Sequence, residues 1–181
     1  MPLLVVRDLQ HVYISMTQSE PLSVNISAGI CLWIKGDNGS GKSTFLKLIA
    51  GVLPVDIGHL TVSGPFSYLG AELGMKMHAT LADHQRFTKA LGVECESSLP
   101  KNRELDNFSS GQKLWIRLAS ALRPDRPLWL LDEPTRFLDA KHETLLWGRV
   151  KQHCASGGSV VVASHTPVAS WIADCQILAL A

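Results

Sequence analysis

Short apolar runs alternate with segments of helical periodicity along this chain. Runs of β-forming residues between turn residues predict strands, and apolar residues three or four positions apart predict helices. The pattern predicts strands at 30–34, 58–64, 66–70, 128–131 and 159–163, and helices at 45–52, 114–122 and 140–154. The runs at 128–131 and 159–163 are continuously apolar, which is typical of parallel strands that are covered on both faces.

The N-terminal region has a different pattern. Residues that favour strands cluster at 3–6, 12–14 and 22–27, and we predict antiparallel strands that lead to the strand at 30–34. Tyr13 lies in the second of these clusters. Its ring could stack on an adenine base, or it could pack on its neighbours as a strand tyrosine, and the sequence leaves both interpretations open.

The middle of the chain changes character again. From residue 74 to about 106 the sequence is polar and helix-prone, with a sparse apolar stripe of Leu81, Phe87 and Leu91. Pro100 follows and breaks this pattern. We therefore predict a small helical insertion at about 74–122, within a single domain that spans residues 1–181.

A nine-residue segment between the strand at 30–34 and the helix at 45–52 matches the phosphate-loop pattern G-x-x-x-x-G-K-[ST]. Its glycines allow successive backbone N–H groups to turn toward an anion, and the helix start adds a favourable dipole. Lys42 adds a positive charge, and Ser43 offers a hydroxyl to Mg²⁺. A glycine-rich turn that binds nothing is the alternative, but it does not require Gly-Lys-Ser between a strand and a helix. The residues are Gly36, Asp37, Asn38, Gly39, Ser40, Gly41, Lys42, Ser43 and Thr44.

Polar residues follow two predicted strands at their carboxyl ends. Asp132 and Glu133 come directly after the strand at 128–131, and His165 follows the strand at 159–163. Carboxylates at the end of a buried strand are costly unless they act on something. Asp132 is suited to a Mg²⁺ shell and Glu133 to polarising an attacking water. His165 is expected at the same edge of the sheet, where ligands of open α/β sheets bind.

The turn-rich segment 107–112 opens the helix at 114–122. Ser109 is a candidate N-cap, and a helix start is also a potential anion site. Ordinary helix capping explains the same residues, so the segment taken alone does not decide between the two.

Composition narrows the choice of partners. The 181 residues carry a net charge of +1, which does not support general nucleic-acid binding. No apolar run reaches the length of a membrane span, and the N-terminus does not read as a signal peptide, so we expect a cytoplasmic location.

The cysteines are widely spaced without a C-x-x-C motif, which favours reduced structural thiols: Cys31, Cys95, Cys154 and Cys175.

The order of these motifs resembles the nucleotide-binding domain of ABC transporters, and the resemblance covers nearly the whole chain. It is carried by the phosphate loop, by segments 108–112, 131–135 and 137–139, and by His165. It implies an α/β P-loop NTPase with a mostly parallel central sheet flanked by helices, an N-terminal antiparallel β subdomain and a small helical insertion. It also implies an ATPase that uses ATP and Mg²⁺.

The resemblance implies a role for each matching residue of the nucleotide site. The phosphate loop and Tyr13 would bind ATP, with Tyr13 stacked on the adenine. Ser43 and Asp132 would hold Mg²⁺. The family has a glutamine near position 72, where this chain has Glu72, and an ionised carboxylate ligates a metal but donates no hydrogen bond.

Other matching residues would act in hydrolysis and between subunits. Glu133 resembles the catalytic glutamate, His165 the switch histidine, and Asp139 the aspartate of the D-loop that runs between two subunits. Phe108 and Ser110 depart from the family's leucine and glycine but keep an apolar anchor and a small residue. In the family the signature loop contacts ATP held by the opposite subunit, and here it comprises Ser109, Ser110, Gly111 and Gln112.

The resemblance also implies partners. One phosphate loop and one signature loop per chain imply a head-to-tail homodimer or a paired ABC subunit, bound peripherally to integral membrane subunits on the cytoplasmic side of the inner membrane. The short chain and the segment 66–76 are most similar to the ATP-binding subunits of cytochrome c biogenesis, which handle haem export. No haem ligand is assigned. The alternatives are the ATPase of another small importer or exporter, a soluble ABC ATPase without a transport role, and a binding module that does not hydrolyse ATP.

Overall fold

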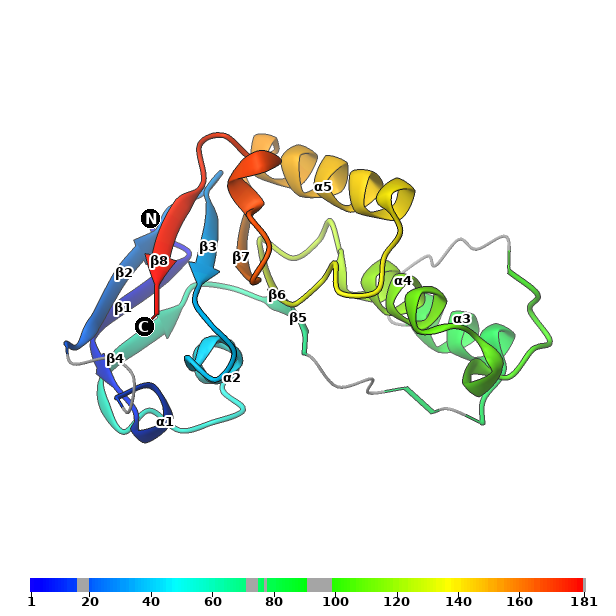
Figure 1. The fold of residues 1–181 in the computed structure, drawn as a ribbon, viewed down its shortest axis with the longest axis horizontal. Helices are drawn as coiled ribbons and strands as arrows, with labels where there is room; N and C mark the ends of the chain where they lie inside the picture. The colour runs from blue at the N-terminus through cyan, green and yellow to red at the C-terminus, as the bar shows by residue number, and fades with distance from the viewer. Residues whose placement is uncertain (16–19, 71–74, 77, 91–98, 181) are drawn as a thin grey trace.

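A five-stranded parallel sheet forms the centre of the molecule (Figure 1). The computed structural model describes residues 1–15, 20–70, 75, 76, 78–90 and 99–180, so Glu72, Leu91 and Cys95 lie outside the described residues. The strand order is β5-β6-β7-β3-β8. Their bounds are Phe66–Leu69 for β5, Leu128–Asp132 for β6, Ser159–Ala163 for β7, Cys31–Lys35 for β3 and Gln176–Ala179 for β8.

The two central strands, β6 and β7, are buried at every position. Successive side chains of a strand point to opposite faces, and along β6 the residues Leu128 and Leu130 join one hydrophobic cluster while Trp129 and Leu131 join the other. Helix α2 (Lys42–Ile49) packs in the first cluster, and α4 (Ser110–Ala121) and α5 (Ala140–Ala155) pack in the second. This double coverage explains why these strands are continuously apolar in the sequence.

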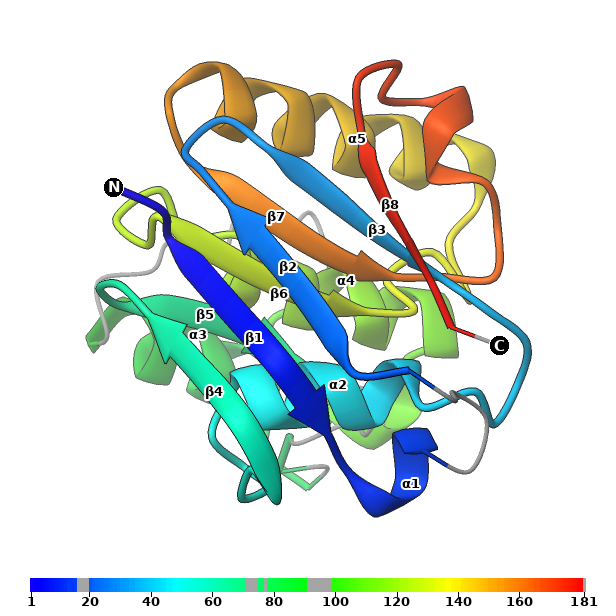
Figure 2. The ribbon, with the colours of Figure 1, turned by 90° about the vertical axis from the view of Figure 1, so that its left-hand side faces the viewer.

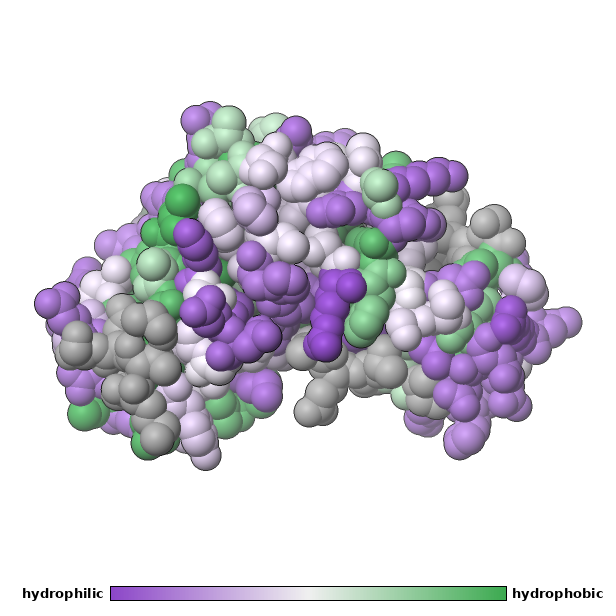
Figure 3. Space-filling view, in the orientation of Figure 1, coloured by the Kyte–Doolittle hydropathy of each residue, from purple (hydrophilic) through white to green (hydrophobic). Residues whose placement is uncertain are grey.

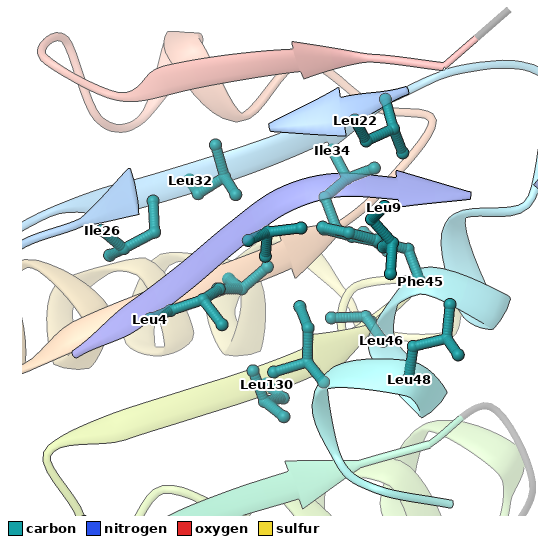
Figure 4. Packing of buried hydrophobic residues seen from close by; sticks show 14 of the residues in the cluster. Leu4, Leu9, Leu22, Ile26, Leu32, Ile34, Phe45, Leu46, Leu48 and Leu130 are labelled. Carbon is teal, nitrogen blue, oxygen red and sulfur yellow. The ribbon is translucent and has the colours of Figure 1, made fainter. Parts of the chain in front are cut away.

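A second, antiparallel sheet covers α2 from the other side (Figure 2). Its strand order is β2-β1-β4, with β1 at Leu4–Gln10, β2 at Leu22–Ile26 and β4 at Ile57–Val62. Leucine and isoleucine side chains of β1 and β2 meet Phe45 and Leu46 of α2 and Leu130 of β6 (Figure 4). Helix α2, which follows the phosphate loop, is therefore held between two sheets.

The predicted strand at 12–14 is wrong, because Val12–Ser15 forms the short helix α1. The Ile14 N–H donates to the His11 carbonyl at 2.9 Å, which closes a turn in place of a strand pairing. Ile14 is 2% exposed, whereas Val12 and Tyr13 are 58% and 61% exposed. One buried residue after two exposed ones fits a helical turn as well as a strand, so the short pattern could not separate the two.

A group of helices extends to one side of the two sheets (Figure 1), and we call it the helical arm. It comprises α3 (Leu81–Ala90), the 3₁₀ turn η1 (Leu105–Asn107) and α4. A small core of Leu81, Leu105, Phe108 and Ile116 holds it together. Its surface is largely hydrophilic in the view of Figure 3. Leu81 is buried as predicted, but Phe87 of the same predicted stripe is 63% exposed.

The C-terminal part adds an element that was not among the predicted strands. After β7 come the 3₁₀ turn η2 (Val168–Ser170) and the edge strand β8, which pairs in parallel with β3. Three of the four β8 residues are exposed, so the segment has no continuous apolar run to mark it. The other predicted strands and helices are confirmed within a few residues at their ends.

A buried histidine makes the stability of this fold depend on pH. His153 of α5 is 8% exposed, and its ring is stacked on Trp129 at 3.7 Å between centroids, with 6° between the planes. Gly158 lies so close to this ring that any side chain at position 158 would collide with it. Burial lowers the pKa of His153 below its usual 6.5, while a hydrogen bond to the Pro127 backbone acts in the opposite direction.

We expect His153→Gln to reduce the pH dependence of the free energy of unfolding. The native protein keeps His153 neutral, whereas the unfolded chain takes up a proton below about pH 6.5, so stability falls as the pH drops through this range. Urea unfolding at pH 5 and pH 7.5 checks this. The variant should be less stable than the parent at both pH values because it lacks the stacked ring. Its free energy of unfolding should, however, change less between pH 5 and pH 7.5 than that of the parent. An unchanged difference would contradict the assignment.

Candidate active site

The phosphate loop joins β3 to α2 and is shaped by its glycines. Gly39 and Gly41 have φ values of +88° and +91°, in the region that side chains with a Cβ resist. At Gly36 a Cβ would collide with the Ser40 side chain and lie 2.5 Å from the Leu180 carbonyl oxygen. The loop therefore adopts a backbone in which N–H groups can converge on an anion at the start of α2.

Lys42 is enclosed by the loop. It is 7% exposed, and its Nζ donates to the carbonyl oxygens of Gly36 and Asp37, at 2.7 Å each. An ammonium group has three N–H donors, so these two bonds leave one for a phosphate oxygen. The loop thus fixes the charge of Lys42 at the site predicted for phosphates.

Asp132 ends β6 with a buried carboxylate that is 2% exposed. Burial raises its pKa, the nearby Ser43 hydroxyl lowers it, Glu133 raises it, and Lys47 and Lys42 lower it. Neither carboxylate oxygen has a hydrogen-bond partner of normal geometry among the described residues. An acceptor-only group that is buried beside a serine hydroxyl and left without a hydrogen bond suits a divalent cation with oxygen ligands. Ser43 and Asp132 therefore fit the predicted Mg²⁺.

Glu133 and His165 lie together at the carboxyl ends of β6 and β7. Glu133 Oε2 and His165 Nδ1 share a hydrogen bond of 2.9 Å, as the common strand edge predicts. Glu133 has a φ of +46°, which is uncommon for a residue with a side chain, and its N–H donates to the Ala163 carbonyl at 2.9 Å. The strand pairing thus holds Glu133 in this conformation and directs its carboxylate toward His165.

These two side chains line a hollow of about 770 Å³ together with the front of the phosphate loop. Asp37 and Asn38 of the loop contribute to it, which confirms that the loop and the two strand ends meet. Thr135, the last residue of the predicted segment 131–135, also lines it, together with three residues that no motif predicted: Arg136, Glu143 and Thr166. Arg136 and Thr166 directly follow residues of predicted motifs in the sequence, and this proximity was a signal that could have identified them. Glu143 reaches the hollow only because of the way α5 packs, which the sequence does not show.

The signature segment lies elsewhere, at the start of α4. Ser109 is the N-cap, and its hydroxyl accepts from the Gln112 N–H at 3.2 Å while the Gln112 side chain accepts from the Ser109 N–H at 3.0 Å. This reciprocal capping confirms the predicted N-cap. Ser109, Ser110, Gly111 and Gln112 line a separate hollow of about 780 Å³ with Asp139. None of them lines the hollow that holds Glu133.

Tyr13 lies beside the phosphate loop rather than in a strand. A Cβ on Gly41 would be 3.3 Å from the Tyr13 carbonyl oxygen, so α1 packs against the loop. The Tyr13 ring is 61% exposed and has a tilted contact with the His11 ring at 5.6 Å. The packing of a strand tyrosine is therefore the wrong alternative, and adenine stacking by Tyr13 stays a prediction. Glu72, the third predicted Mg²⁺ ligand, lies outside the described residues.

Comparisons with known proteins point to one family. The family model described as ABC transporter matches residues 19–136. A protein named cytochrome c biogenesis ATP-binding export protein CcmA, from Cereibacter sphaeroides, is 33% identical over 176 residues, covering 92% of this chain and 83% of that protein. A protein of the same name from Paracoccus denitrificans is 32% identical, covering 99% of this chain and 90% of that protein.

The fold has solved relatives as well. A structure titled as the ATP binding subunit of an ABC transporter superposes with a TM-score of 0.81 at 23% identity, and covers 98% of this chain and 85% of that chain. This likeness supports the fold: the strand order, the antiparallel sheet and the helices are those of a P-loop ATPase domain, as predicted.

The fold and the phosphate loop define a P-loop NTPase of the ABC class. The chain belongs to the ABC transporter family, as an ATP-binding subunit with ABC-type ATPase activity. The predicted resemblance is thereby confirmed. Among the described residues, no helix combines the length and apolar character that a membrane span requires.

Lys42→Ala should weaken ATP binding by roughly 10- to 100-fold, because hydrogen bonds to charged groups contribute about 1.5–3 kcal/mol. Isothermal calorimetry with ATP measures the change. Lys89→Ala is the matched control, since Lys89 is an exposed lysine on α3. ATP affinity that is equal in the two variants would contradict the assigned phosphate site.

Proposed function

We propose that this chain is the ATP-hydrolysing motor subunit of a transporter that handles haem in cytochrome c biogenesis. The observation that carries this proposal is the similarity to proteins named as CcmA export proteins, at 33% identity over 92% of this chain. The partners would be integral membrane subunits that handle haem, with this chain bound on the cytoplasmic side of the inner membrane. Residues 1–181 would form one nucleotide-binding domain, with residues 74–122 as its helical insertion.

The nucleotide site supports a division of roles among its residues. Lys42 and the loop N–H groups would bind the β- and γ-phosphates, and Tyr13 would stack on the adenine. Ser43 and Asp132 would hold Mg²⁺, with Glu72 as a further ligand. The ion, when bound, neutralises charge on the phosphate oxygens.

Hydrolysis requires a base and a group that orients it. Glu133 would accept a hydrogen bond from the attacking water and draw off its proton as the water approaches the γ-phosphate. His165, with its proton on Nδ1, would donate to Glu133 Oε2 across the observed 2.9 Å and so leave Oε1 for the water. Because His165 is 54% exposed, it can also reach a phosphate oxygen at the open side of the hollow.

The separation of the two hollows supports a composite site. Glu133 lines one hollow with Asp37 and Asn38 of the phosphate loop, whereas the signature residues line another hollow, between α4 and the segment that leads into α5. A second copy arranged head to tail would place its signature loop, with the start of α4, over the phosphates bound by the first. ATP would then join the two subunits, and hydrolysis would release them.

Glu133→Gln should leave ATP affinity within about twofold of the parent and lower hydrolysis by roughly 100-fold or more, the range attributed to general bases. The amide keeps the size of the carboxylate but accepts no proton. Size-exclusion chromatography with light scattering should then detect an ATP-dependent dimer. Hydrolysis at the parental rate would contradict the role of Glu133, and a monomer with bound ATP would contradict the composite site.

A third hollow, of about 760 Å³, is suited to docking of the membrane partner. It lies between α2, β5 and the helical arm, and exposes the apolar side chains of Val52 and Phe87 at 60% and 63%. Lys47 and Arg117 line it, and none of its described lining residues is acidic. A partner segment that combines apolar and acidic side chains would complement it.

Phe87→Ser should reduce the amount of membrane subunit recovered with this chain from solubilised membranes, while ATPase activity of the isolated chain stays within about twofold, as for most surface substitutions. Ile177→Ser on β8 is the matched control, because Ile177 is 57% exposed and lies outside this hollow. Recovery of haem-handling integral proteins supports the proposed transporter. Recovery of a permease for periplasmic solutes would replace it with the alternative of another small importer.

A further inference from the structure

The signature segment and the D-loop touch within one chain. A Cβ on Gly111 would lie 2.5 Å from the Phe137 carbonyl oxygen, so the backbones of the two segments approach as closely as a glycine allows. Both segments line the hollow of about 780 Å³, together with Asp139 and His142. The segments that are expected to face a second subunit therefore share one surface in the monomer.

His142 holds Asp139 through two contacts with the same carboxylate oxygen. The backbone N–H of His142 donates to Asp139 Oδ1 at 2.8 Å, which is the N-cap bond of α5. The His142 ring nitrogen Nδ1 lies 2.7 Å from the same oxygen. Both contacts lower the pKa of Asp139, so the carboxylate is ionised at neutral pH. Capping needs only the backbone bond. The ring contact is additional, and it requires a side chain with an N–H donor at the position of Nδ1.

The His142 ring also contacts helix α4. The His142 ring meets the Trp115 ring edge to face, at 4.8 Å between centroids and 63° between planes. Trp115 lies one turn after the signature segment, and the Arg149 guanidinium stands over its ring at 5.5 Å. Trp115 is thus held by α5 from two positions, and the His142 ring bridges the signature helix to Asp139.

We propose that His142 is a positioning residue that fastens the Asp139 carboxylate to α4, so that the D-loop and the signature segment of one subunit present a single rigid surface to the other. The Asp139 side chain is 65% exposed, and without the ring only the backbone N–H of His142 would hold it in the separated subunit. Ordering such a side chain on dimer closure costs conformational entropy. A carboxylate that is already oriented reduces this cost and favours the closed arrangement in which hydrolysis occurs.

The proposal rests on the composite site proposed above, and two substitutions of His142 separate its parts. His142→Phe keeps an aromatic ring against Trp115 but cannot hydrogen-bond to Asp139. His142→Asn places an amide donor close to the position of Nδ1 but loses the ring. Lys151→Ala is the control, because Lys151 is an exposed residue near the other end of α5.

The rate of ATP hydrolysis by the full chain is measured against ATP concentration for each variant. We expect His142→Phe to lower kcat by about three- to tenfold, within the range of couplings between contacting residues, with KM for ATP changed by less than about twofold. His142→Asn should recover most of the loss, and Lys151→Ala should match the parent. A purely structural role would instead lower the melting temperature and raise KM as well.

A double-mutant cycle with Asp139→Ala, which removes both carboxylate oxygens, supplies the second readout. If His142 acts through Asp139, then His142→Phe should have little further effect on kcat once Asp139 is changed. Parental kcat in His142→Phe, or additive effects in the cycle, would overturn the proposal. These outcomes leave the composite site standing if Glu133→Gln still forms an ATP-dependent dimer. Absence of that dimer would overturn the composite site itself.

Discussion

The burial of two opposite charges at one edge of the parallel sheet is the constraint on which the rest of the structure depends. Lys42 and Asp132 are 7% and 2% exposed, and each would be costly there without polar partners. Two loop carbonyls accept hydrogen bonds from Lys42, whereas no described residue donates a hydrogen bond of normal geometry to Asp132. The fold thus keeps a partly unsatisfied polar site at the end of a strand that is buried at every position, and such a site is stable only because the packing around it is extensive.

That packing comes from α2 and its two sheets. Phe45 and Leu46 are fully buried between the antiparallel sheet and the parallel sheet, so the helix that carries Lys42 cannot shift without disturbing both. Glu133 is restrained differently, by a bond from its N–H to Ala163 and a positive φ. The strand edge is therefore rigid where phosphates are expected. Its open side, lined by His165 and Arg136, is exposed and available to a second subunit.

The helical arm is stabilised in part by a hydrophobic core of its own. It has its own small core around Leu81 and Phe108, separate from the two main clusters. Its contacts with the rest of the chain include the close approach of Gly111 to Phe137 and the ring contact of Trp115 with His142. Leu114 and Leu118 of α4 also join the second main cluster, so α4 connects the arm's own core to the parallel sheet.

The sequence by itself determined the phosphate loop, the buried strands at 128–131 and 159–163, the N-cap Ser109 and the family. Each of these features requires particular residue types: glycines in the loop, a side-chain oxygen at the N-cap, and continuous apolar residues in strands that are covered on both faces. The sequence did not determine α1, since one buried residue after two exposed ones fits a turn or a strand, nor β8, whose edge position requires no apolar run. The sequence predicted that Glu133 and His165 share a strand edge, but only the tertiary structure decided that they share a hydrogen bond. The tertiary structure also decided that the signature segment lies in a different hollow and that His142 reaches Asp139 and Trp115 together. These are contacts between elements, and their geometry depends on how the layers pack rather than on any local pattern.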